Sequence, residues 1–162
     1  MAAARLCARN GWHVQLFTTP SVLTAIADFL PTLPVHAVID HFGLLSMGPE
    51  GAAQSDMLAR LLATGRIWVK LSGSYRVAAD AFDAKITALA RKLAAANPDR
   101  VVWATDWPHT PGGKAAGKDP HTVSDMLNVD TPRLLAFVKD WFPDTAMHQK
   151  LLVDNPAKLY GF

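Results

Sequence analysis

His41, Arg76 and Asp106 are the residues whose types and spacing suggest chemistry, since each lies just beyond one of three successive β-like runs. An aspartate can take the proton of an attacking water, a neutral histidine can polarise a carbonyl, and an arginine can bind a planar carboxylate through two N–H groups. Each residue alone also has an ordinary structural interpretation, as a hydrogen-bonded histidine, a turn-capping aspartate or a surface arginine. Their shared position favours one site, because the carboxyl ends of parallel strands meet at one edge of a sheet.

Three further residues near these runs leave their interpretation open. Trp107 follows Asp106 and could form the wall of a pocket for a flat ring. His109 could contact a substrate carboxylate or close the turn after the preceding proline, and the sequence favours neither. Lys70 lies in the middle of a β-like run, where it could pair with an acid or turn outward.

Four short runs rich in branched and aromatic residues predict the strands that must position these groups. The runs are 12–17, 35–40, 67–71 and 101–105. Apolar residues at helical spacing predict helices between and after them. These helices are 20–30, 55–63, 79–95 and 131–142, with shorter ones from Asp144 to Leu152 and over 155–160. Thr131 is expected to cap its helix, with a proline at the first helical position, and residues 111–120 are expected to form a flexible loop.

Strands that alternate with helices predict an α/β fold with a parallel sheet and flanking helices. A closed (β/α)8 barrel needs about 200 to 250 residues, so four such units in 162 residues make half of one. An open doubly wound sheet is the alternative that the pattern alone allows.

Composition excludes several classes of protein. The chain is 50% hydrophobic and 19% charged, with a mean hydropathy of +0.11, which is too apolar for a disordered chain. The net charge of +2 and the absence of basic runs give no sign of a nucleic-acid partner, and no run of 18 apolar residues predicts a membrane span. A single cysteine, Cys7, excludes an internal disulfide and favours a reducing compartment, so we expect a cytoplasmic location. The length is that of one domain, which we expect to cover residues 1–162.

Four segments together resemble the TIM-barrel amidohydrolase-related family, and within it the 2-pyrone-4,6-dicarboxylate lactonase branch. They are 38–43 (VIDHFG), 68–73 (WVKLSG), 97–101 (NPDRV) with 105–109 (TDWPH), and 155–162 (NPAKLYGF). The resemblance implies that the four strands are the fifth to the eighth of a barrel. It also implies that His41 and Asp106 are catalytic, with Asp106 as the base toward water, and that Arg76 grips a substrate carboxylate.

The chain departs from this family in one important respect. The family begins with a His-X-His pair on its first strand, and this sequence has none. The chain therefore resembles the C-terminal half of a member, without the first four strands. If a divalent metal such as zinc were used, His41 and Asp106 would be its ligands here, although zinc sites usually have three or four. Because the lactonase branch is thought to work without metal, we expect no cofactor.

Three hypotheses about function follow. The first is a hydrolase of a cyclic ester, a lactone of a carboxylated small molecule, in the catabolism of aromatic compounds, which works by aspartate-assisted attack of water. The second is a metal-dependent decarboxylase of the same superfamily. The third is an inactive half-barrel that pairs with another chain or with itself, since four strands leave two open sheet edges.

Overall fold

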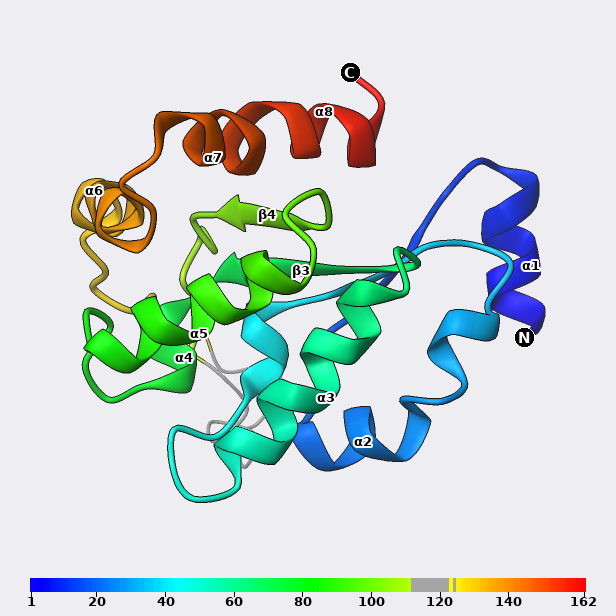
Figure 1. Ribbon diagram of the computed structural model, residues 1–162, viewed down its shortest axis with the longest axis horizontal. Helices are drawn as coiled ribbons and strands as arrows, with labels where there is room; N and C mark the ends of the chain where they lie inside the picture. The colour runs from blue at the N-terminus through cyan, green and yellow to red at the C-terminus, as the bar shows by residue number, and fades with distance from the viewer. Residues whose placement is uncertain (112–122, 124) are drawn as a thin grey trace.

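The computed structural model describes residues 1–111, 123 and 125–162, and its centre is a sheet of four parallel strands (Figure 1). The strands are β1 (Val14–Leu16), β2 (Ala37–Ile39), β3 (Ile67–Ser72) and β4 (Val101–Ala104). They lie in the order β1-β2-β3-β4, and the register pairs Gln15 with Val38, Val38 with Trp68, and Lys70 with Val102. The parallel sheet with flanking helices is confirmed. The doubly wound alternative is wrong, because the strand order never reverses.

Helices connect and follow the strands. They are α1 (Ala2–Arg9), α2 (Pro20–Ile26), α3 (Gly51–Ala63), α4 (Ser74–Val77), α5 (Ala84–Ala96), α6 (Thr131–Trp141), α7 (Thr145–Gln149) and α8 (Asn155–Tyr160). Two 3-10 turns, η1 (Leu30–Thr32) and η2 (His41–Leu44), and a π-helical turn, η4 (Lys150–Asp154), complete the described elements. None of the described helices combines the length and the hydropathy needed to cross a bilayer.

Capping side chains set several helix boundaries and correct the predicted ones. The helix predicted over 79–95 begins at Ala84, because the Asp83 carboxylate accepts a hydrogen bond from the Lys85 N–H. The helix predicted over 20–30 ends at Ile26, and Leu30–Thr32 form the separate 3-10 turn η1.

The predicted role of Thr131 as a helix cap is wrong. Asp130 caps α6, because its carboxylate accepts a hydrogen bond from the Arg133 N–H at 2.9 Å. Thr131 is the first helical residue, and its hydroxyl is therefore available for another partner. The predicted loop over 111–120 lies, apart from Pro111, outside the described residues.

The two faces of the sheet are different. Alternate residues, among them Ile39, Val69 and Leu71, belong to the main hydrophobic core, to which α3 and α5 contribute. Figure 1 shows these two helices together on one side of the sheet. The opposite face carries a smaller apolar cluster of Val38, Trp68 and Val102, against which Leu159 of α8 packs.

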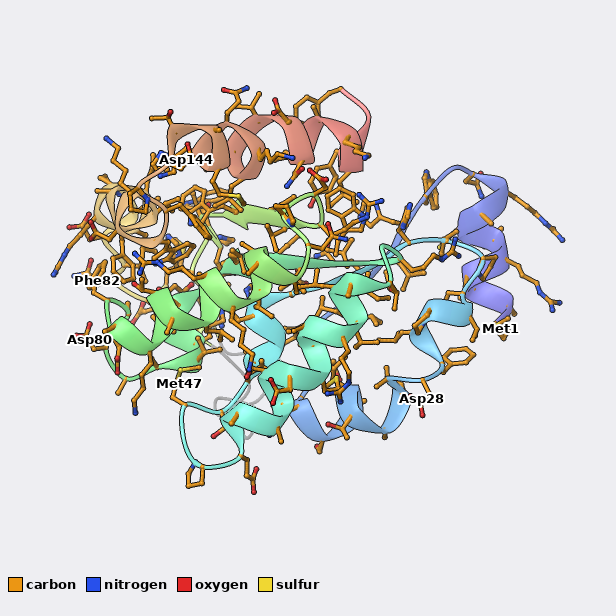
Figure 2. All side chains as sticks on the ribbon, viewed as in Figure 1. Met1, Asp28, Met47, Asp80, Phe82 and Asp144 are labelled. Carbon is orange, nitrogen blue, oxygen red and sulfur yellow. The ribbon has the colours of Figure 1, made fainter. Side chains whose placement is uncertain are left out.

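The outer surface carries both polar side chains and exposed apolar ones, among them Trp12 and Phe17. Figure 2 shows the side chains on the ribbon, and the labelled Asp28, Asp80 and Asp144 lie at its periphery. Within the described residues, β1 pairs only with β2 and β4 only with β3, so both outer strands are open edges. The four described strands do not close into a barrel, and His41, Arg76 and Asp106 lie beyond the carboxyl ends of three of them.

Candidate active site

The structure brings His41, Arg76 and Asp106 together at the carboxyl ends of β2, β3 and β4. Arg76 Nε lies 2.5 Å from Asp106 Oδ2, and His41 Nε2 lies 3.6 Å from Asp106 Oδ1. The three side chains are largely buried, with 11 to 13% of each exposed. They form a largely buried cluster with one carboxylate at its centre, which is the convergence that the strand-end positions predicted. Their catalytic and binding roles stay predictions.

Backbone of unusual conformation places two of these side chains. His41 has a φ of 52° and Asp106 a φ of 63°, in the left-handed region that non-glycine residues rarely adopt. The turn η2 continues in this region through Leu44 and is held by Phe42, which is fully buried and packs edge-to-face on Trp141, with ring centroids 5.8 Å apart. Such strain persists only where the surrounding structure imposes it, and it concentrates at functional sites.

Gly73 gives the cluster its space. Its φ is 59°, and a Cβ atom at this position would lie 2.9 Å from Asp106 Oδ2 and 3.0 Å from His41 Nδ1. No other residue type combines this backbone conformation with such close neighbours. The glycine is therefore part of the site, although sequence reasoning placed it only within a family motif.

The surroundings of the His41 side chain favour the neutral form of its imidazole ring. Its Nδ1 lies 2.9 Å from the Ser72 hydroxyl, and the ring of Phe17 packs edge-on at 5.4 Å. Burial lowers the pKa of His41, and the opposing effect of the carboxylates of Asp106 and Asp40 does not cancel it. The imidazole is thus neutral at pH 7, with a single N–H to donate.

The two oxygens of Asp106 have different neighbours. Oδ2 accepts hydrogen bonds from Arg76 Nε and from the Tyr75 hydroxyl at 2.6 Å. Within the described part of the chain, Oδ1 accepts none and faces His41. Arg76 also donates from Nη2 to the Thr110 carbonyl at 3.0 Å, and in the part of the chain that the structure describes its Nη1 has no partner.

Tyr75 belongs to this cluster and was missed by sequence reasoning. Burial, together with the hydrogen bond to Asp106, raises the pKa of the Tyr75 hydroxyl well above its usual value, so it remains a proton donor. The guanidinium of Arg76 lies over its ring at 5.2 Å. The available signal was its place beside Arg76, on the same short turn after β3.

The two other predicted binding residues lie in opposite surroundings. His109 is only 6% exposed, and both its ring nitrogens have partners, Tyr75 at 3.0 Å and Thr131 at 2.9 Å. Trp107 is 76% exposed and has no recorded side-chain contact with the cluster among the described residues. The structure therefore places His109 behind Tyr75 and Trp107 at the surface.

A second polar group lies on the same face of the sheet. Lys70, which the sequence left undecided, donates to Gln15 Oε1 at 2.8 Å and lies 3.3 Å from Asp40 Oδ1. Gln15 in turn donates to Asp40 Oδ2 at 2.9 Å. This Gln15–Asp40–Lys70 group links three neighbouring strands, and its Asp40 directly precedes His41.

The donor set for a metal is incomplete. His41 and Asp106 approach each other, but the described residues contain no group of three or more histidine, cysteine, aspartate or glutamate side chains. A zinc site takes three or four such ligands, so these residues do not by themselves fit a zinc ion. Further ligands would have to come from residues outside the described ones.

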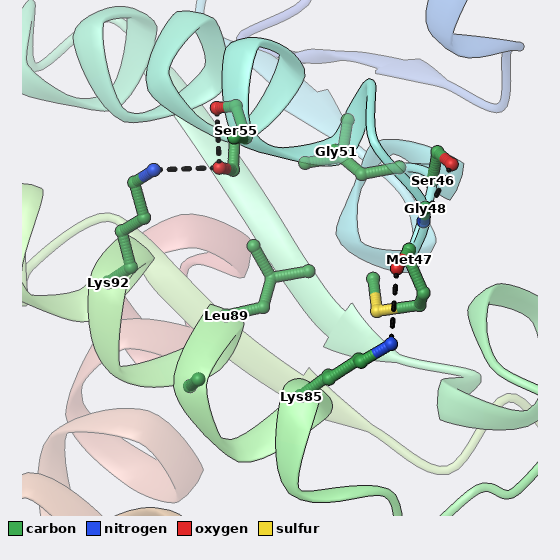
Figure 3. Close-up of a pocket in the computed structure, with 11 residues that line it drawn as sticks. Ser46, Met47, Gly48, Gly51, Ser55, Lys85, Leu89 and Lys92 are labelled. Atoms are coloured by element: carbon green, nitrogen blue, oxygen red, sulfur yellow. Dashed lines mark hydrogen bonds between the residues drawn. The ribbon is translucent and has the colours of Figure 1, made fainter.

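A separate pocket of about 240 Å³ lies between α3 and α5 (Figure 3). Lys92 and Lys85 line it, and both are engaged: Lys92 donates to the Ser55 hydroxyl at 2.7 Å and Lys85 to the Met47 carbonyl at 3.4 Å. The pocket shares no lining residue with the strand-end cluster.

Comparison with known proteins gives a consistent result. A family model described as Amidohydrolase matches residues 1–162. The 4-sulfomuconolactone hydrolase of Hydrogenophaga intermedia is 32% identical over 158 residues, which are 96% of this chain and 48% of that protein. The 2-pyrone-4,6-dicarboxylate hydrolase of Comamonas testosteroni is 32% identical over 171 residues, 99% of this chain and 52% of that protein.

A solved structure agrees with these relatives. The crystal structure of an apo protein from Agrobacterium tumefaciens superimposes with a TM-score of 0.74 at 26% identity, covering 98% of this chain and 54% of that one. The chain thus spans about half the length of the curated relatives it matches. Its four parallel strands with flanking helices are half of a (β/α)8 barrel, as the sequence predicted.

Proposed function

This chain belongs to the amidohydrolase family, and from that premise we propose that the protein hydrolyses a lactone of a carboxylated small molecule. The single observation that supports this most is the Asp106 carboxylate, with Oδ2 held by Arg76 and Tyr75 and Oδ1 turned toward a neutral His41. The named relatives from Hydrogenophaga and Comamonas are both lactone hydrolases, which supports a lactone as substrate.

The proposed reaction uses side chains of this chain. Asp106 Oδ1 takes a proton from water while the water oxygen attacks the lactone carbonyl carbon, and the neutral His41 donates its N–H to the carbonyl oxygen. The tetrahedral intermediate then breaks its ring C–O bond, and the proton on Asp106 passes to the leaving oxygen. The products are a carboxylic acid and a hydroxyl on the opened chain, so no other reactant is consumed.

Arg76 is proposed to bind the substrate carboxylate. Its Nε and one Nη2 donor are occupied by Asp106 and the Thr110 carbonyl, whereas Nη1 has no recorded partner among the described residues. An anionic substrate group at Nη1 would lie beside the Asp106 carboxylate, and the guanidinium between the two would offset their repulsion. The proposed substrate is for this reason anionic.

The alternatives have less support. We place the metal-dependent decarboxylase second, because the two curated relatives named above are lactone hydrolases and the described residues supply only two candidate ligands. We also propose a cytoplasmic location, in keeping with a single cysteine. Open edges at β1 and β4 support pairing through the sheet, with a second copy or with another half-barrel.

The experiment uses the protein at its natural length. It is incubated with 2-pyrone-4,6-dicarboxylate and, separately, with 4-sulfomuconolactone, and the absorbance of the lactone is followed. Turnover of either compound is expected. If the protein opens neither lactone ring and binds neither compound in a calorimeter, the proposed function is refuted.

A further inference from the structure

Three hydrogen bonds link the start of α6 to Asp106. The Thr131 hydroxyl lies 2.9 Å from His109 Nε2, His109 Nδ1 lies 3.0 Å from the Tyr75 hydroxyl, and that hydroxyl donates to Asp106 Oδ2 at 2.6 Å. Residues from three places in the chain, α4, the segment after β4 and α6, thus meet in one line. The line ends on the carboxylate at the centre of the site.

The chemistry of the four groups gives this line a single direction. Tyr75 has one hydroxyl proton, which goes to Asp106, so toward His109 its oxygen must accept. His109 therefore donates from Nδ1–H. In the neutral tautomer that carries this Nδ1–H, Nε2 is an acceptor and the Thr131 hydroxyl is its donor. In that tautomer every proton in the line points toward Asp106.

The surroundings of His109 fix its ring in this arrangement. Its side chain is buried, and its φ of 59° lies in the left-handed region. Its backbone N–H donates to the Asp106 carbonyl at 2.9 Å, and its carbonyl accepts from the Leu127 N–H at 2.8 Å. The ring stands edge-on to Tyr75, with centroids 5.8 Å apart. Strained backbone held from both sides is typical of a residue whose orientation matters.

The start of α6 leaves the Thr131 hydroxyl available for this line. Asp130 provides the cap, as its carboxylate bonds the Arg133 N–H. At the start of α7, Asp144 provides the cap by accepting from the Ala146 N–H, and it is likewise followed by a threonine, Thr145, which is exposed. Both helix starts thus contain an Asp-Thr pair, and of these two threonines only Thr131 has a side-chain hydrogen bond to another described residue.

We propose that Thr131, His109 and Tyr75 are positioning residues that hold the Asp106 carboxylate with Oδ1 turned toward His41. Rotation of the carboxylate would cost the hydrogen bonds from both Tyr75 and Arg76 on Oδ2. The start of α6 then sets the geometry of the base, although it does not touch the reacting atoms. The part of this inference that concerns the base rests on the proposed function, whereas the direction of the hydrogen bonds does not.

The direction is tested without any substrate. Nitrogen-15 NMR of imidazole-labelled protein at its natural length distinguishes the two neutral tautomers, and a His109→Gln variant assigns the signal. The expected result is the Nδ1–H tautomer for His109. An Nε2–H tautomer would overturn the proposal, because Tyr75 would then have to donate to His109 instead of to Asp106.

The positioning role is tested with three matched variants on a lactone that the protein opens. Thr131→Val removes the hydroxyl at nearly constant volume and is expected to lower kcat about 2- to 10-fold, the range for one neutral hydrogen bond, with KM little changed. Thr131→Ser keeps the hydroxyl and should restore kcat. Thr145→Val makes the same change at the start of α7 and should leave kcat unchanged.

The outcomes separate the two proposals. Equal losses in Thr131→Val and Thr131→Ser would overturn the positioning role, since the hydroxyl would not be the cause, and so would an unchanged kcat in Thr131→Val. Tyr75→Phe, which removes the last link to a charged acceptor, should cost about 10- to 100-fold in kcat. If the unaltered protein opens no lactone, the proposed function fails, and the tautomer of His109 still decides the direction of the line.

Discussion

The two oxygens of the Asp106 carboxylate have different surroundings: Oδ2 accepts hydrogen bonds from protein donors, and Oδ1 faces His41. Asp106→Asn keeps the size and shape of the side chain but cannot take a proton from water. We expect at least a 1,000-fold (roughly 4 kcal/mol) loss of lactone hydrolysis with substrate binding mostly retained. Single-turnover kinetics and calorimetry on the same preparation measure the two effects. Hydrolysis at the unaltered rate would refute Asp106 as the base.

Burial lowers the pKa of both His41 and His13 below the ordinary value of 6.5. The unfolded chain therefore takes up these protons first as the pH falls, so the stability from both groups is complete above about pH 6.5 and declines below it. Urea unfolding between pH 5 and 8 should show this decline. It should be shallower in His41→Gln and in His13→Gln, and curves of identical slope would contradict the assignment.

Gly73→Ala tests the space at the centre of the cluster. The added Cβ must adopt a positive φ and also meets Asp106 Oδ2 and His41 Nδ1. Gly65→Ala is the matched control, because Gly65 has a φ of 71° and nothing within 4 Å of the added atom. Both variants should lose about 1 to 2 kcal/mol of stability from the backbone. Only Gly73→Ala should also lose most of the activity, and equal activity in the two variants would contradict this role.

Among the elements, β1, β2 and β3 are tied by the group of Gln15, Asp40 and Lys70. Lys70→Met removes the cation and leaves the Asp40 carboxylate, whose side chain is 9% exposed, without its charge partner. This should destabilise the fold by about 3 kcal/mol, and the double variant with Asp40→Asn should recover part of that loss. Chemical denaturation of the unaltered protein, the two single variants and the double variant gives the coupling free energy between Lys70 and Asp40. Additive effects would show that the ion pair is of little consequence.

The sequence was informative about elements where local signals agree with tertiary structure. Branched and aromatic runs identified the four strands of the described sheet. At β1 the paired residues, Val14–Leu16, are fewer than the predicted run 12–17, whereas β3 extends one residue beyond its run, to Ser72. Prediction of the α6 cap failed because Thr131 and Asp130 both have capping side chains, and only the fold shows which one bonds the helix N–H groups.

The site was predictable to the extent that it follows strand ends. His41, Arg76 and Asp106 come together because parallel strands bring their carboxyl ends to one edge. Tyr75 and His109 meet across more than thirty residues of sequence, in turns without regular periodicity. Neither their contact nor the burial of His109 has a local signal that composition or spacing could reveal.

For the whole molecule, the open sheet edges are the dominant feature. Phe17 follows β1 and is 59% exposed, and in the described sheet β1 is an edge strand that pairs only with β2. We expect the purified 162-residue chain to self-associate at micromolar concentration, because strand edges and apolar surface both favour pairing. Light scattering over a dilution series measures this.

Phe17→Ser should shift that association toward the monomer. Val22→Ser, at an exposed position on α2, should not. A chain that is monomeric at every concentration would refute association through the edges.

The left-handed backbone at His41, Asp106 and His109 has a consequence for how this protein can change. Each such residue costs of order 1 to 3 kcal/mol, whereas glycine at the same position costs little. Selection for thermal stability alone should therefore enrich glycine or asparagine at these three positions, and it would remove the proposed donor His41, the proposed base Asp106 and the proposed positioning residue His109. In a library screened first for heat resistance and then for lactone opening, variants that gain stability at these three positions should lose lactone opening.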